Sequence, residues 1–214
     1  MNFLTDPAEI EQKSLSIISE KLTGRNFAPE NINMIKRVIH TTADFDYADN
    51  LFFSKGAAAA AKAALTSGAN LVTDTQMAYS GINKKALAQL GSAVHCFISE
   101  PQVAASAKEK GTTRAWAAVE YAAKNLAAPL IFVVGNAPTA LIRLYELIKA
   151  GEISPALIIA APVGFVNVVE SKELILTLPT PHIVAQGQKG GSNVAAAICN
   201  ALMYEITERS FAAL

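Results

Sequence analysis

Short apolar runs alternate along the chain with longer segments in which apolar residues recur every three or four positions. This alternation is typical of a parallel sheet with helices on both faces, because its strands are buried on both sides. The apolar runs predict about five strands, at Asn70–Thr75, Ala93–Ile98, Leu130–Val134, Leu157–Ala161 and His182–Ala185. We therefore predict an α/β fold with a mostly parallel sheet.

The segments with helical periodicity lie before and between these runs. Pro in a first turn and Gly after the last turn mark where such helices start and stop. The predicted helices are Pro7–Lys21, Pro29 to about His40, Lys55–Ser67, Lys84–Gln89, Thr113–Asn125, Pro138–Ala150, Val168–Leu176 and Ser192–Thr207. The first two form a helical N-terminal region. Because no linker or repeat interrupts the pattern, we expect one domain over residues 1–214.

Composition and charge narrow the classes of protein. Apolar residues make up 51% of the chain and charged residues 17%, which favours a densely packed globular protein. Lysine plus arginine equals aspartate plus glutamate, and no basic stripe appears, so we expect no nucleic-acid partner. The N-terminus lacks a signal-peptide pattern and the apolar runs are too short to span a bilayer, which predicts a cytoplasmic protein without a membrane partner. Cys96 and Cys199 lack metal-ligand spacing; we interpret both as buried thiols and predict no metal site.

The loops that follow the predicted strands hold most of the unusual residues. Ligands of open parallel sheets bind at the carboxyl ends of the strands, so these loops are the candidate site. The residues that we expect to contact a ligand there are Asp74, Met77, Asn136, Pro138, Gly164, Lys189, Gly190 and Gly191. Free backbone N–H groups at 136–139 and 190–193 would favour an anion. An ordinary strand-to-helix turn explains the same sequences, and neither a Walker loop nor GxGxxG is present.

Two charged residues lie at helix ends. Arg114 begins a predicted helix, where a cation opposes the helix dipole, so a carboxylate partner would explain it. His40, within "RVIHTTADFDYAD", ends a helix and precedes Asp44, Asp46 and Asp49. The helix dipole and these acids would favour its protonated form. From the residues alone, His40 is either a helix cap or a general acid.

Six blocks occur in a distinctive order: "EIEQKSLSII", "RVIHTTAD", "GTTRAWAA", "VGNAPTALIRLYELI", "APVGFVNVVESKE" and "GQKGGSNVAAAICNAL". With them, nearly the whole chain resembles the precorrin-8X and cobalt-precorrin-8 methylmutases of corrin biosynthesis. The resemblance implies suprafacial migration of a methyl group from C11 to C12 of a tetrapyrrole, giving hydrogenobyrinate or cobyrinate. It implies no organic cofactor, since any cobalt belongs to the substrate. It further implies a tightly bound product and a homodimer whose subunits help build each other's sites.

The resemblance also assigns roles to individual residues. The family's catalytic histidine matches His40, which Thr41 follows in "VIHTT", while its serine and arginine match Ser14 and Arg114. These matches shift the interpretation of His40 from helix cap to general acid. The alternative is a tetrapyrrole carrier, which needs the same cavity but no proton donor. A nucleotide- or sugar-phosphate-binding domain has only the glycine-rich loops in its favour.

Overall fold

The computed structural model describes residues 3–207 and contains one mixed sheet in the strand order β1-β6-β5-β4-β2-β3. The strands are β1 (Leu51–Phe53), β2 (Asn70–Thr73), β3 (Ala93–His95), β4 (Leu130–Val134), β5 (Leu157–Ala160) and β6 (His182–Ala185). Neighbouring strands from β2 to β6 pair in parallel, and β1 pairs antiparallel with β6. The prediction of an α/β fold with a mostly parallel sheet is confirmed.

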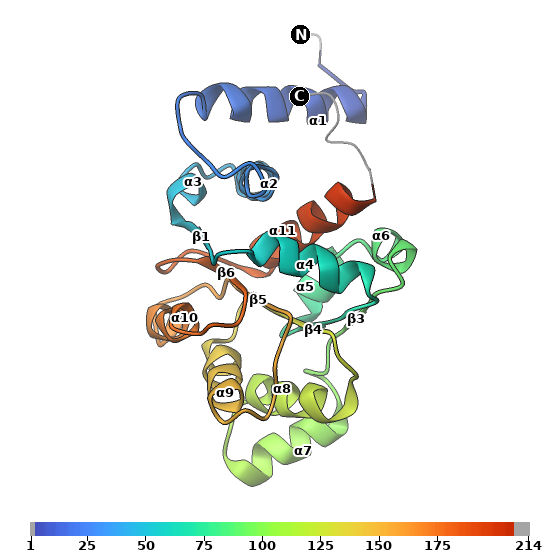
Figure 1. The fold of residues 1–214 in the computed structure, drawn as a ribbon, viewed down its shortest axis with the longest axis vertical. Helices are drawn as coiled ribbons and strands as arrows, with labels where there is room; N and C mark the ends of the chain where they lie inside the picture. The colour runs from blue at the N-terminus through green and yellow to red at the C-terminus, as the bar shows by residue number, and fades with distance from the viewer. Residues whose placement is uncertain (1–2, 208–214) are drawn as a thin grey trace.

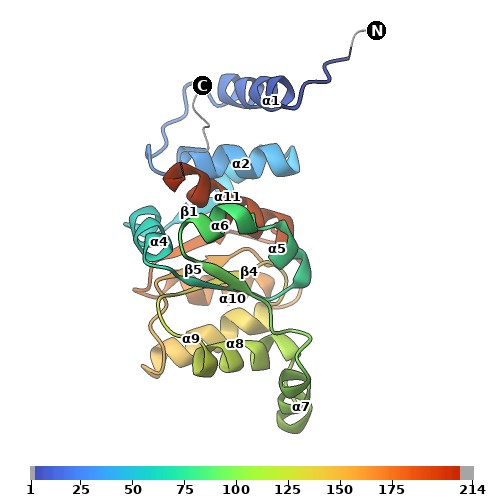
Figure 2. The same cartoon turned by 90° about the vertical axis from the view of Figure 1, so that its right-hand side faces the viewer.

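Helices cover both faces of this sheet. The helices are α1 (Pro7–Lys21), α2 (Ile32–Thr42), α3 (Tyr47–Asn50), α4 (Ala57–Thr66), α5 (Gln76–Gly81), α6 (Lys84–Gln89), α7 (Pro101–Lys110), α8 (Arg114–Asn125), α9 (Pro138–Lys149), α10 (Val168–Leu176) and α11 (Ser192–Ile206). In Figure 1, α4 and α11 lie on one face and α8, α9 and α10 on the other. The helix α2 lies over α11, and α1 lies outside α2 (Figures 1 and 2). Among the described residues, every helix is too short or too polar to cross a bilayer.

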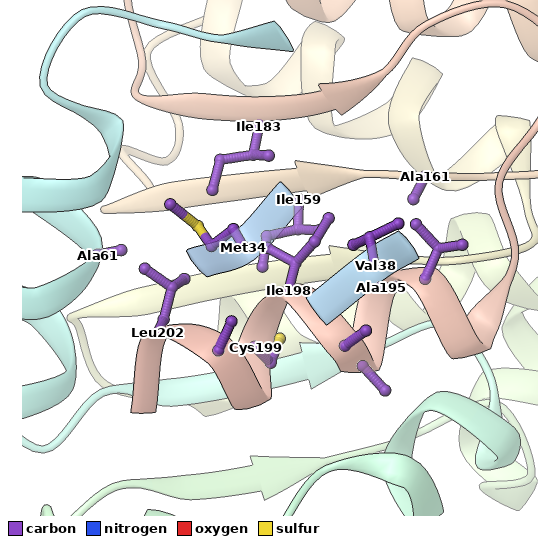
Figure 3. Packing of buried hydrophobic residues seen from close by; sticks show 14 of the residues in the cluster. Met34, Val38, Ala61, Ile159, Ala161, Ile183, Ala195, Ile198, Cys199 and Leu202 are labelled. Carbon is purple, nitrogen blue, oxygen red and sulfur yellow. The ribbon is translucent and has the colours of Figure 1, made fainter. Parts of the chain in front are cut away.

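The helix α11 is buried between the sheet and α2. Figure 3 shows Ile198 and Leu202 of α11 close to Ile159 of β5 and to Met34 of α2. A helix that is enclosed on two sides needs small residues where it approaches its neighbours closely. The alanines of "NVAAAICNAL" meet this need, which explains why the last helix is apolar on nearly all sides.

Several predicted boundaries and elements were wrong. The strand predicted at Ala93–Ile98 ends at His95, and α7 starts at Pro101, where no helix was predicted. Only Val103 and Ala107 of α7 are buried, so its apolar pattern is too sparse to indicate a helix. The helices α3 and α5 were also missed. Cys199 is buried as predicted, whereas Cys96 is partly exposed because it follows the end of the short edge strand β3.

The strand β1 was missed as well, and it positions the candidate site. Its first residue, Leu51, pairs with Ala185 at the carboxyl end of β6. The N–H of Gln186 donates to the carbonyl of Asn50 at 2.8 Å, which extends this pairing. Because β1 runs antiparallel, the segment before it reaches the edge of the sheet where the carboxyl ends of the parallel strands lie. That segment is the one that follows His40.

Candidate active site

His40 lies in the last turn of α2 and is partly buried. The helix ends at Ala43, which has a φ of 56° and donates its N–H to the carbonyl of Ile39. Burial is the main cause that lowers the pKa of His40 below 6.5, and the charge of Arg37 lowers it further. Glu11 of α1 opposes them and does not reverse the shift. Our expectation that the pKa of His40 is raised was therefore wrong: the structure favours the neutral imidazole.

The three aspartates after His40 have other partners. Asp44 and Asp46 both accept from the Nζ of Lys189 at 2.6 Å, and Asp49 accepts from Arg25 at 2.7 Å. Lys189 holds the pKa of the Asp44 carboxyl below its usual value, and the two acids raise the pKa of Lys189. These acids therefore do not hold the imidazole of His40 protonated. They fasten the segment after α2 to the loop that contains Lys189.

A cavity of about 230 Å³, with several polar residues in its lining, opens beside the helix turn that contains His40. It is lined by Arg37, Thr41, Gly81, Asn193, Ala196, Ala197, Asn200 and Tyr204. Arg37 pairs with Glu11 at 2.9 Å, and its guanidinium carbon lies 5.4 Å from the ring centroid of Tyr204. Sites that enclose a drug-sized ligand measure ~300–1,000 Å³. This cavity therefore has room for one acidic side chain of a large ligand and not for the whole ligand.

The carboxylate of Asp74 is occupied within the protein. Asp74 is only 6% exposed, and its Oδ1 accepts the N–H of Gly135 at 2.8 Å. Its Oδ2 accepts the N–H groups of Asn136 and Ala137 at 2.8 and 2.7 Å. Burial raises the pKa of Asp74, while these three hydrogen bonds oppose that shift.

Asp74 therefore corrects two predictions. Its oxygens already accept hydrogen bonds from the chain, so the carboxylate is not free to contact a substrate. Within the stretch 136–139, residues 136–138 offer no free N–H to a substrate anion, because Asp74 takes the N–H groups of Asn136 and Ala137 and Pro138 has none. Asp74 occupies the place that the sequence suggested for an external anion. The side chain of Asn136 is exposed beside it.

The glycines of the last loop allow two loops to approach closely. A Cβ on Gly190 would lie 2.3 Å from the carbonyl oxygen of Ala161, and the N–H of Gly191 donates to that oxygen at 2.8 Å. Gly191 is also the N-cap of α11, so neither Ser192 nor Asn193 caps that helix. The hydroxyl of Ser192 instead lies 2.7 Å from that of Thr75. The N–H of Gly191 is therefore engaged within the protein.

Apolar side chains are exposed in the loops at the same edge of the sheet. Met77, in the first turn of α5, is 70% exposed, and Phe165, after β5, is 85% exposed. Val163 and Val166 flank Phe165 and are exposed too. Gly164, with a φ of 141°, donates its N–H to the carbonyl of Gln188, which links this loop to the glycine-rich loop. These side chains offer an apolar surface to a flat ligand.

Arg114 and Ser14 lie on opposite sides of the sheet. Arg114 is the first residue of α8, is exposed, and has no ion-pair partner among residues 3–207. Thr113 is the N-cap of α8, and its hydroxyl accepts the N–H of Trp116. Ser14 lies on α1, partly exposed, and donates to the carbonyl of Ile10. Since α1 and α8 lie at opposite ends of the view in Figure 1, one chain does not bring Ser14 and Arg114 together.

Sequence reasoning missed Arg37 as part of the site. Arg37 is three residues before His40 and therefore lies on the same side of α2. That spacing was a signal in the sequence. By contrast, the lining by Asn193 and Tyr204 depends on how α11 packs on α2, which no local pattern shows.

The chain is similar to known proteins over nearly its whole length. A family model described as precorrin-8X methylmutase matches residues 9–205. The cobalt-precorrin-8 methylmutase of Salmonella typhimurium is 44% identical over 213 residues, which cover 97% of this chain and 100% of that protein. The precorrin-8X methylmutase of Pseudomonas aeruginosa is 37% identical over 207 residues, with coverages of 96% and 99%. The crystal structure of precorrin-8X methylmutase from Thermus thermophilus superposes with a TM-score of 0.86 at 38% identity, covering 94% of this chain and 98% of that one.

Proposed function

Because the chain belongs to the precorrin-8X methylmutase family, we propose that it moves a methyl group from C11 to C12 of its tetrapyrrole, with His40 as general acid. The family and its named relatives make the chain an isomerase that acts on precorrin-8X or cobalt-precorrin-8 in cobalamin biosynthesis. The observation that supports the role of His40 is its place in the last turn of α2, between Arg37 and Thr41, which both line the cavity. A substrate carboxylate in that cavity would bring the macrocycle close to the imidazole.

The reaction uses one proton, which His40 gives to the substrate and later receives back. The bond from the methyl carbon to C11 breaks as the bond to C12 forms, so the substrate gains and loses no atoms. A proton from His40 polarises the conjugated ring, and general acids of this kind contribute ~10²–10⁴-fold to a rate. The proton must return to His40 before the next turnover, because an isomerisation leaves the proton count unchanged. The proposal includes no organic cofactor, since the migrating group comes from the substrate itself.

Substrate binding would supply the negative charge that the surroundings of His40 lack in the free chain. In the free chain, burial and Arg37 favour the neutral imidazole of His40. Carboxylates of the substrate would pair with Arg37 and place negative charge near His40, and both effects raise the pKa of the imidazole. We therefore propose that His40 takes up its proton when the substrate binds.

The remaining candidate residues fit different parts of the substrate. Arg114 has an exposed guanidinium that pairs with no acid in the described part of the chain, which suits a substrate carboxylate. Met77 and the loop around Gly164 offer apolar surface to the macrocycle. Lys189 is already paired with Asp44 and Asp46, so a substrate carboxylate would compete with two acids for its ammonium.

We propose that the protein acts as a homodimer. The family resemblance assigns both Ser14 and Arg114 to the site, yet the two lie on opposite sides of the sheet within one chain. A second copy can supply the missing side chain. Ile10 and Ile17 of α1 are exposed and lie two helical turns apart, flanking Ser14, so this face of α1 suits contact with a partner.

If the substrate contains cobalt, its ring nitrogens are bound to the metal and cannot accept the proton of His40. His40 would then act on a ring carbon, or through its electric field on the developing charge. Comparing turnover of the metal-free and cobalt-containing substrates under identical conditions assigns the route that the protein serves.

The test is a turnover assay with substrate in hundred-fold excess over protein. We expect complete conversion to the orange corrin chromophore by the wild type and by Lys36→Ala, a control on the same helix. His40→Ala should bind the tetrapyrrole and convert it ~10²–10⁴-fold more slowly. An undiminished rate in His40→Ala would remove the general acid from the proposal. A spectral change limited to one equivalent of substrate would indicate a carrier.

A further inference from the structure

Lys172 is a buried lysine that has no acidic partner among the residues that the structure describes. It lies on α10 and is 1% exposed. Its Nζ donates to the carbonyl oxygen of Gly187 at 2.7 Å and to that of Lys189 at 2.9 Å. Lysines are almost never fully buried unless a charge partner offsets the loss of water. Here two backbone carbonyls of the glycine-rich loop take the place of that partner.

The two carbonyls belong to a loop with little regular structure. Gly187 has a φ of 72°, a left-handed conformation that glycine adopts most readily. Two backbone hydrogen bonds join the loop to the segment after β5. The N–H of Gly164 donates to the carbonyl of Gln188, and the N–H of Gly191 donates to the carbonyl of Ala161. The ammonium of Lys172 binds the loop from within, between residues 187 and 189. It therefore fixes the direction in which Lys189 leaves the backbone.

Lys189 transmits this constraint to the segment after His40. Its ammonium reaches Asp44 and Asp46, both at 2.6 Å. The hydroxyl of Tyr47 adds a contact of 3.5 Å to the carbonyl oxygen of Gly190. Residues 43–46 connect α2 to α3, which begins at Tyr47, and His40 lies one turn before Asp44. An unbroken series of contacts thus leads from Lys172 to the turn that carries His40.

We propose that Lys172 is a positioning residue, which holds the loop 187–191 in the conformation that fixes the chain after His40. Through Gly190 and Gly191, the loop also approaches the buried residues Ala161 and Pro162, which lead into the exposed segment 163–167, so both sides of the site depend on it. Lys172 itself need not touch the substrate. The inference rests on the proposed function in one respect, that His40 is the acid whose position matters.

Lys172 loses its positive charge at a lower pH than an ordinary lysine does. Burial alone lowers its pKa to about 8, and neither α9 nor β6, which pack against α10, contributes a charge to that shift. The charged groups on the loop side are Lys189, Asp44 and Asp46, which pair with one another, and none of them contributes to the shift of Lys172. A neutral amine keeps two hydrogens, so the bonds to Gly187 and Lys189 become weaker above pH 8 and are not lost. The loop should loosen gradually as the pH rises.

The experiment compares Lys172→Met with Lys172→Gln, because both keep the length of the side chain approximately and only glutamine keeps N–H donors. Hydrogen exchange is followed in the segments 186–191 and 41–50 of the protein without substrate, and turnover is measured separately. In Lys172→Met, we expect exchange in both segments to accelerate about 10- to 100-fold and turnover to fall about ten-fold or more, as for a lost charge-assisted hydrogen bond. Lys172→Gln should recover part of both. Lys149→Met, an exposed lysine of α9, is the control and should match the wild type.

The outcomes separate the inference from the function it rests on. Unchanged exchange in segment 41–50 or unchanged turnover in Lys172→Met would overturn the role of Lys172. Failure of the wild type to convert substrate would overturn the proposed function instead. If neither variant folds, the wild type is measured from pH 6.5 to 9.5. Protection factors in segment 186–191 should then fall above pH 8 relative to those of α8, and constant relative protection would overturn the inference.

Discussion

At the scale of single residues, the groups around His40 oppose its protonated form in the free chain. Arg37 lies one turn away on the same helix, and burial acts in the same direction. The sequence showed the histidine at a helix end with acids after it, and that placement is confirmed. It could not show that Lys189 and Arg25, from distant segments, would take those acids as partners. Residue types and positions were predictable, whereas the pairing of charges depended on the tertiary structure.

The pH dependence of turnover follows from this environment. A general acid works in its protonated form, so activity is present below its pKa and is lost as the pH rises through it. Because the pKa of His40 is lowered in the free protein, kcat/KM should fall with rising pH through a midpoint below 6.5. The profile of kcat should fall at a higher pH, because substrate carboxylates raise the pKa in the complex. Initial rates from pH 5 to 9 measure both profiles, and a kcat/KM midpoint well above 6.5 would contradict this account.

At the scale of elements, strands that end at one edge place loops from distant parts of the chain together. The helices α1, α6 and α10 have the predicted ends, because proline, caps and apolar periodicity mark them locally. The strand β1 was not predictable in this way, since its three residues become a strand only by pairing with β6. That pairing brings the segment after His40 to the loop of Lys189. The local signals therefore predicted most elements and missed the one that assembles the site.

The variant Asp74→Asn tests whether this carboxylate holds the loop after β4 through the N–H groups of residues 135–137. Asp74→Asn replaces an oxygen that accepts two N–H groups with an amide that donates. Because an unsatisfied buried N–H costs ~1–3 kcal/mol, the free energy of unfolding should fall by about 2–5 kcal/mol. Asp49→Asn, which breaks an exposed pair with Arg25, should cost less than about 1 kcal/mol. Urea denaturation measures both variants, and equal costs would show that Asp74 does not hold the loop.

At the scale of the whole molecule, the sheet and its two helical layers were predictable from the alternation of patterns. The resemblance of the ordered sequence blocks, and not the periodicity, indicated the function. What the sequence could not show is the distance between Ser14 and Arg114, which depends on α1 lying outside α2 on one side and α8 on the other (Figure 1). This separation makes a site shared between two copies the simplest arrangement. In such a dimer, the exposed apolar face of α1 would contact the second copy.

The dimer is tested by adding charge to that face. We expect light scattering to give twice the mass of one chain for the wild type. The double variant Ile10→Glu/Ile17→Glu should shift the protein toward the monomer and lower turnover, because burying two carboxylates in an apolar contact is unfavourable. Ala105→Glu, an exposed position on α7, should remain dimeric. A monomeric wild type with full activity would contradict the shared site.

The central claim is that the protein moves a methyl group from C11 to C12 with the help of His40. The most direct measurement uses substrate with ¹³C in the methyl group at C11 and follows that carbon by NMR during turnover. We predict that the labelled carbon becomes bonded to C12 with the wild type, and that His40→Ala gives this product ~10²–10⁴-fold more slowly. A labelled carbon that stays on C11 while the chromophore changes, or equal rates for the two proteins, would contradict the account.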